Sequence, residues 1–135
     1  MRINFLGVII SAIVIVLLRY LWNAHFGGAD WGHFIGKAAA DVQADRKAAG
    51  LELVNALVLS TALGWVIGRL RDRSLATGLG VGVLACVGFA LTVVSTTVIH
   101  GAAWQSLIPE GGFYLAAYVI AGAILGAMAP KRTAA

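Results

Sequence analysis

The strongest constraint on this 135-residue chain is a set of four long apolar stretches, which cover residues 3–21, 51–70, 75–99 and 113–129. A helix needs about 20 consecutive apolar residues to cross the hydrocarbon core of a bilayer. The chain is 12% charged, whereas about 25% of the residues of a soluble domain are charged. The sequence therefore predicts an all-α integral membrane protein, with four transmembrane helices in a single domain over residues 1–135 and the lipid bilayer as its surroundings.

Basic residues in the short flanks predict the orientation. Six of them gather on one side of the membrane: Arg2, Arg69, Arg71, Arg73, Lys131 and Arg132. The other side carries Arg19, Lys37, Arg46 and Lys47, offset by Asp30, Asp41, Asp45, Glu52 and Glu110. Because cytoplasmic loops are enriched in Lys and Arg, we expect a multi-pass protein of the bacterial inner membrane with both termini cytoplasmic. The net charge of +4 is spread over these flanks, so nucleic acid is not an expected partner.

The long connection over residues 22–50 has two unlike halves. The first half is rich in aromatic and ionisable residues and contains Gly27-Gly28, where the chain can turn. The second half, "FIGKAAADVQADRKAAG", is rich in alanine and ends at Gly50. It predicts a short helix along the outer surface, with a break at Gly50 before the second span. The other connections are short, so the four spans should form one antiparallel bundle.

Small residues at four-residue spacing predict where the helices approach each other. In lipid, helices associate through close packing and hydrogen bonds rather than through the hydrophobic effect. The glycine pairs expected at these contacts are Gly64 with Gly68, Gly78 with Gly82, and Gly122 with Gly126.

The third span has a small and polar face and an apolar face when it is drawn as a regular α-helix, with about 100° per residue. The first face holds Gly78, Gly82, Ala85, Thr92, Thr96 and His100, interrupted by Phe89, and we expect it to face protein. The opposite face holds Leu84, Val87, Leu91, Val94 and Val98, and we expect it to face lipid.

Arg19 has two interpretations. Its side chain can extend to the lipid headgroups, or it can pair with Glu52, which begins the second span at the same depth. In either case the polar residues near the outer ends of the spans form a candidate ligand-binding recess that opens outward. Its members are Arg19, Glu52, Asn55, Thr92, Thr96 and His100.

Aromatic residues near the outer ends are expected to anchor the bundle at headgroup level, and these are Trp22, Phe26, Trp31 and Trp104. A metal site is not expected, because His25 and His33 are eight residues apart and no paired histidine or cysteine motif is present. Nor is a catalytic group or a cofactor expected, because Ser and Thr in membrane helices usually bond to backbone carbonyls and no hydrolase elbow motif occurs.

Several short patterns occur in a characteristic order. The first span ends in Trp22 and is followed by Phe26-Gly27 and Trp31, the third has a glycine-rich start and Gly88-Phe89, and the fourth reads "GGFYLAAYVIAGAILGA". In this order they resemble the small bacterial membrane proteins of domain-of-unknown-function family seventeen sixty-one, over residues 7–129. The resemblance implies four helices, and the family brings no settled activity.

Two functions fit these features. The first is a non-enzymatic helical module that acts through homo-oligomerisation or as an accessory subunit of a membrane complex. The alternative is a small transporter or ligand-binding membrane protein that uses the outer recess.

Overall fold

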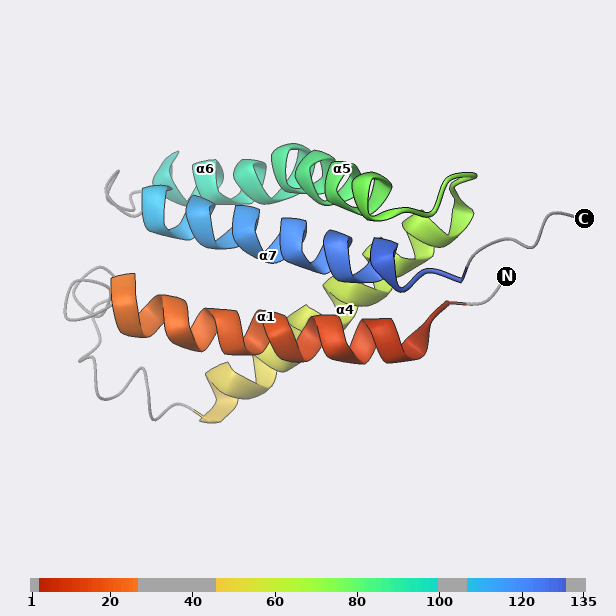
Figure 1. The fold of residues 1–135 in the computed structure, drawn as a ribbon. Coiled ribbons are helices and arrows are strands. Elements are labelled where there is room, and N and C mark those ends of the chain that lie inside the picture. Colours follow the sequence, from red (N-terminus) through yellow and green to blue (C-terminus); the bar gives the residue numbers. More distant parts are fainter. Residues whose placement is uncertain (1–2, 27–45, 100–106, 131–135) are drawn as a thin grey trace, which may run out of the picture.

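The chain folds into a bundle of helices in the computed structural model, which describes residues 3–26, 46–99 and 107–130 (Figure 1). The first, second and fourth spans are the α-helices α1 (Phe5–Phe26), α4 (Arg46–Arg69) and α7 (Leu107–Ala127). The third span consists of α5 (Leu75–Ala85), the π-helical turn η1 (Cys86–Ala90) and α6 (Leu91–Ile99). No strand occurs in these three described ranges.

Four helical stretches are long and apolar enough to cross a membrane, judged by length and composition. They are Phe5–His25, Ala49–Arg69, Leu75–Thr96 and Ile108–Ala127. The predicted fold class, an all-α protein with four membrane-length helices, is confirmed.

The ends of the helices show where local sequence decides structure. Asn4 precedes α1, and its Oδ1 accepts a hydrogen bond from the N–H of Gly7 at 3.2 Å. Ser74 precedes α5 and accepts from the N–H of Thr77 at 3.2 Å. Both are N-cap contacts, which satisfy backbone donors that the first turn of a helix leaves open.

The predicted break at Gly50 is wrong, because α4 begins at Arg46 and continues through Gly50. A glycine inside a helix costs about 1 kcal/mol relative to alanine, which does not end a helix that is continuous on both sides. The rest of the expected surface helix, residues 34–45, lies outside the described residues.

Helix α7 occupies the centre of the bundle. It packs against α5, α1 and α4, and α1 also packs against α4. Figure 1 shows α7 between the third span and α1, with α4 crossing obliquely. Small core residues permit this close arrangement: Ala12 on α1, Ala56 on α4, and Ala117 and Ala121 on α7 are each at most 2% exposed.

Glycines form the contact between α5 and α7. A Cβ atom added at Gly82 would lie 2.9 Å from the carbonyl carbon of Tyr118. One added at Gly78 would lie 2.9 Å from the Cα of Gly126, and Gly122 meets Gly78 in the same way. The two backbones touch because no side chain separates them. The predicted pair Gly78 and Gly82 on α5 thus faces the predicted pair Gly122 and Gly126 on α7.

The remaining pair, Gly64 and Gly68, lies on α4 in a different environment. A Cβ at Gly64 would make ordinary contacts with side chains of Val8 and Leu125, at 3.5 and 3.4 Å. Gly68 is half-buried, and its carbonyl accepts a hydrogen bond from Arg73 at 2.5 Å.

The π-helical turn changes which residues of the third span face the bundle. In η1 the N–H of Leu91 donates to the carbonyl of Cys86, five residues earlier, instead of four residues earlier as in an α-helix. The turn therefore contains one extra residue. The buried residues consequently follow a strict four-residue spacing: Gly78, Gly82, Cys86, Ala90 and Val94.

This spacing overturns part of the predicted face of the third span. Thr92 and Thr96 are exposed, and Val94, predicted to face lipid, is only 4% exposed. Beyond Ala85, a regular α-helix would bury residues about one position away from those that are buried in the structure. The sequence gives no indication of the extra residue in η1, so the prediction did not include it.

Candidate functional site: the Arg19 cluster

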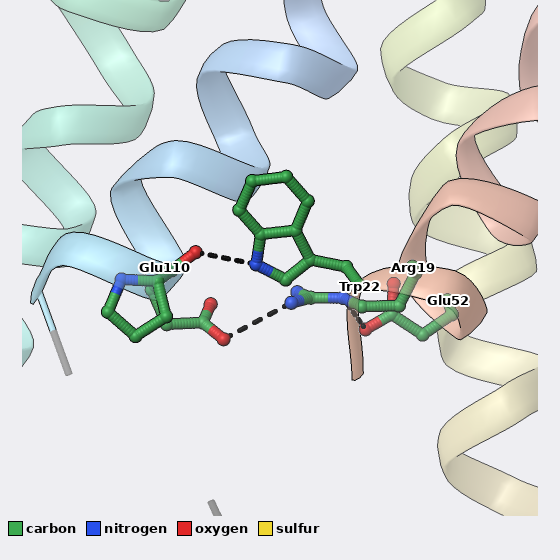
Figure 2. A network of polar contacts seen from close by, with 5 residues as sticks. Arg19, Trp22, Glu52 and Glu110 are labelled. Carbon is green, nitrogen blue, oxygen red and sulfur yellow. Dashed lines mark hydrogen bonds and ion pairs between the residues drawn. The ribbon is translucent and has the colours of Figure 1, made fainter. Parts of the chain in front are cut away.

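Three helices meet around Arg19 at one end of the bundle (Figure 2). Its Nε lies 3.2 Å from Glu52 Oε1 on α4. Its Nη1 donates a hydrogen bond to Glu110 Oε1 on α7, also at 3.2 Å. The Arg19 side chain is 13% exposed, that of Glu110 17% and that of Glu52 35%. One guanidinium group therefore links α1 to both α4 and α7.

Aromatic rings enclose the guanidinium on the bundle side. The Cζ atom of Arg19 lies 3.7 Å from the centroid of the Phe113 ring and 5.7 Å from that of Tyr114. Trp22 packs edge-on against Phe113, with ring centroids 6.2 Å apart. A cation above an aromatic face is attracted by the negative charge of that face. The rings thus stabilise Arg19 in addition to the two carboxylates.

Trp22 makes a further contact to the start of α7. Its Nε1–H donates to the carbonyl of Pro109 at 2.9 Å (Figure 2). Pro109 lies in the first turn of α7, where a missing backbone N–H does no harm. Gly112 leaves room for the indole, since a Cβ there would lie 3.1 Å from Trp22 Cζ2. We call the group formed by Arg19, Trp22, Glu52, Pro109, Glu110 and Phe113 the Arg19 cluster.

Helical spacing explains how the sequence assembles the cluster. Arg19 and Trp22 are three residues apart on α1, and Glu110 and Phe113 are three apart on α7. Residues at this spacing lie on one face of a helix, so each helix presents a charged group and an aromatic ring together. The two faces meet because α1 and α7 are neighbours.

The cluster has one positive and two negative formal charges, and its atoms contact one another. Such an arrangement links three helices in one register, and an ionisable side chain at membrane depth requires such partners. Among the described residues, no group of three His, Cys, Asp or Glu side chains is placed to hold a metal ion. The geometry of the cluster is that of a structural contact that links α1, α4 and α7.

The predicted outer recess is brought together only in part. Of the two interpretations of Arg19, the structure shows the ion pair with Glu52. Asn55 is exposed on α4. Thr92 donates to the carbonyl of Gly88 at 3.3 Å, and Thr96 to that of Thr92 at 2.8 Å. These two threonines lie on the outside of the third span, and His100 lies outside the described residues.

The expected interface anchors have different outcomes. Trp22 is half-buried and bonds within the bundle. Phe26 is the last residue of α1, and Trp31 and Trp104 lie outside the described residues. The prediction that these four residues lie at the headgroups stays a prediction.

Sequence reasoning missed two polar contacts, Arg19 with Glu110 and Ser60 with Ser11. The sequence predicts Glu110 on the outer side but not next to Arg19, although an arginine with two acids at the same depth indicates that three helices pair there. Ser60 donates to Ser11 across the α1–α4 contact at 3.1 Å, and both are fully buried. Single serines within apolar stretches gave no indication of which helix they would meet.

The fold and the cluster define the class: an all-α bundle with four helices long and apolar enough to cross a membrane, in which a charge cluster links three helices. The chain belongs to the family described as "Protein of unknown function (DUF1761)", whose family model matches residues 4–126. The predicted family membership is confirmed. Neither a curated protein nor a solved structure matches the chain.

Proposed function

We propose that this protein is a non-enzymatic module of the bacterial inner membrane that acts by associating with other transmembrane helices, in the first place with a second copy of itself. The contact surface is the third-span outer face, which consists of Gly80, Leu84, Gly88, Thr92, Ser95 and Thr96. The proposed orientation has both termini and the α4–α5 loop in the cytoplasm, in line with the positions of the basic residues.

The observation that carries this proposal is the exposure of small and polar residues on that face. A Cβ added at Gly80 or at Gly88 would meet no atom within 4 Å. Thr92, Ser95 and Thr96 continue the exposed line along α6. The glycines that α5 uses inside the bundle, Gly78 and Gly82, lie on the opposite side and are buried.

Contact with lipid tails does not favour glycine or hydroxyl residues on a helix surface, whereas contact with a second helix does. Small residues let two backbones approach, and hydroxyl groups can bond across the contact. The hydroxyl protons of Thr92 and Ser95 go to carbonyls of their own helix. Their oxygens can still accept a hydrogen bond from a neighbouring helix.

The alternative, a ligand-binding protein or small transporter with an outer recess, has less support. Arg19 and Glu52 pair with each other, but Arg19 is also paired with Glu110, and Thr92 and Thr96 donate to carbonyls of their own span. A recess built on Thr92 and Thr96 does not fit their exposed positions.

Native mass spectrometry of the protein extracted in mild detergent tests the proposal. The wild type should appear as a discrete oligomer, and Gly88→Leu should shift it to monomer, because the added side chain keeps the helices apart. The matched control is Gly50→Leu, which also fills open space but lies on α4, so it should keep the oligomer. A strictly monomeric wild type, or equal loss of oligomer in both variants, would contradict the proposal.

A further inference from the structure

A shallow apolar groove runs along the outside of α4. It is lined by Leu57, Val58, Thr61, Ala62, Trp65 and Val66, and its volume is about 590 Å³. Along the helix, the small residues Thr61 and Ala62 lie between the larger lining residues before and after them. Trp65 is 45% exposed and Val58 63% exposed, so no part of the described chain covers this groove.

Positive charge stands at one end of the groove. The guanidinium of Arg69 lies over the ring of Trp65, with its Cζ 4.2 Å from the ring centroid. Arg71 follows in the exposed loop after α4. No carboxylate among the described residues pairs with either arginine.

The other charged groups of this loop are engaged within the fold. Asp72 accepts hydrogen bonds from Ser74 and Thr77. Arg73 donates to the carbonyls of Gly68 and Pro130. Arg69, the last residue of α4, and Arg71 in the loop are therefore the cations at this end of α4 that can bind an anion from outside.

We propose that this surface binds an anionic phospholipid, with one acyl chain in the α4 groove and the phosphate at Arg69 and Arg71. An apolar groove that ends in two cations matches a molecule with an apolar chain and a negative head. From Leu57 to Arg69 the helix rises about 18 Å, close to the roughly 15 Å thickness of one leaflet of the hydrocarbon core. A free phosphate ion would leave the groove unused.

The proposed orientation agrees with this ligand, because the arginines would face the cytoplasmic leaflet, whose anionic lipids attract basic juxtamembrane residues. The site does not overlap the third-span outer face, so it does not depend on the proposed self-association. Gly88→Leu should leave lipid binding unchanged.

Native mass spectrometry with titrated lipid tests the site. The probes are phosphatidylglycerol and phosphatidylcholine with identical acyl chains. Wild-type protein should retain phosphatidylglycerol preferentially, and Arg69→Gln and Arg71→Gln should each weaken its binding about fivefold. The matched control, Lys47→Gln, removes the same charge from the far end of α4 and should leave binding unchanged.

A second pair of variants tests the groove separately from the charge. Ala62→Phe adds a large side chain in the middle of the groove lining and should weaken binding of both lipids. Ala49→Phe, at the exposed far end of the same helix, should not. Equal binding of the two lipids by the wild type, or equal losses in Arg69→Gln and Lys47→Gln, would overturn the proposal. So would a dimer in which the second copy occupies the groove and excludes lipid.

Discussion

At the scale of single residues, Arg19 links α1 to both α4 and α7. Its guanidinium serves two carboxylates from two other helices and stacks on Phe113. The two carboxylates differ, because Glu110 accepts a hydrogen bond and is 17% exposed, whereas Glu52 is 35% exposed. Solvent weakens an ion pair as exposure rises, so the pair with Glu110 should contribute more.

The first prediction ranks three substitutions in the Arg19 cluster. Arg19→Gln should lower the free energy of unfolding by about 3 kcal/mol, because it leaves two partly buried carboxylates without their cation. Glu110→Gln should cost about 2 kcal/mol, typical of a hydrogen bond to a charged group. Glu52→Gln should cost less than about 1 kcal/mol.

Unfolding in mixed detergent micelles, followed by circular dichroism, measures all three. The double variant Arg19→Gln with Glu110→Gln should be more stable than the sum of the single losses implies, because it removes a carboxylate together with its cation. If Glu52→Gln proved as costly as Arg19→Gln, the ranking by exposure would be incorrect.

At the scale of elements, the third span differs most from expectation. Its buried residues recur every four positions from Gly78 to Val94. A regular α-helix would have turned Thr92 and Thr96 toward the bundle, and the single π-helical turn turns them outward. The polar line on α6 owes its exposure to one extra residue in η1.

The second prediction concerns the backbone contact of α5 with α7. Gly82→Ala should destabilise the protein by about 2 kcal/mol, because its Cβ would meet rigid backbone and force the helices apart. Gly80→Ala is the matched control on the same helix, with open space around the added atom. It should be neutral or stabilising by up to about 1 kcal/mol, through its higher helix propensity. Equal effects of the two in thermal unfolding would argue against a close α5–α7 contact.

The third prediction concerns the N-terminal cap of α5. Hydrogen bonds from Thr77 and Ser74 lower the pKa of Asp72 from its ordinary value of 3.8. A carboxyl whose pKa is lower in the folded state stabilises the fold above the unfolded pKa and loses this effect as the pH falls through the folded pKa. Wild type should therefore be more stable than Asp72→Asn at neutral pH, and the difference should shrink below pH 3.8.

Thermal unfolding of both proteins across this pH range measures that difference. Using the difference removes every pH-dependent contribution that both proteins share. A gap between the two that stayed constant with pH would show that the carboxylate charge of Asp72 plays no part in the cap.

At the scale of the whole molecule, the sequence predicts those features of the fold that depend on one stretch of the chain alone. The four spans follow from the length and apolarity of each stretch, and glycine spacing predicted the small residues of the α5–α7 contact, although not that these two helices would meet. The neighbours of each helix were not predictable in the same way. The partners of Arg19, the Ser11–Ser60 pair and the oblique path of α4 depend on how the helices pack, which no single stretch encodes.

The orientation of the bundle gives the fourth prediction. Ala24 near the end of α1 and Ala76 near the start of α5 are both exposed and lie at opposite ends of the bundle. Each can be replaced by cysteine and labelled selectively, because the native Cys86 is fully buried and should not react. In intact cells, a membrane-impermeant maleimide should label Ala24→Cys and not Ala76→Cys.

The physical reason is the charge difference between the two ends. Arg69, Arg71 and Arg73 leave a net positive charge beside Ala76 after Asp72 is counted, whereas Arg19 is neutralised by its carboxylates at the other end. Positively charged flanks stay in the cytoplasm during insertion. Inside-out vesicles should reverse the labelling. If Ala76→Cys were labelled in intact cells and Ala24→Cys were not, the bundle would be inverted, and Arg69 and Arg71 would face the outer leaflet.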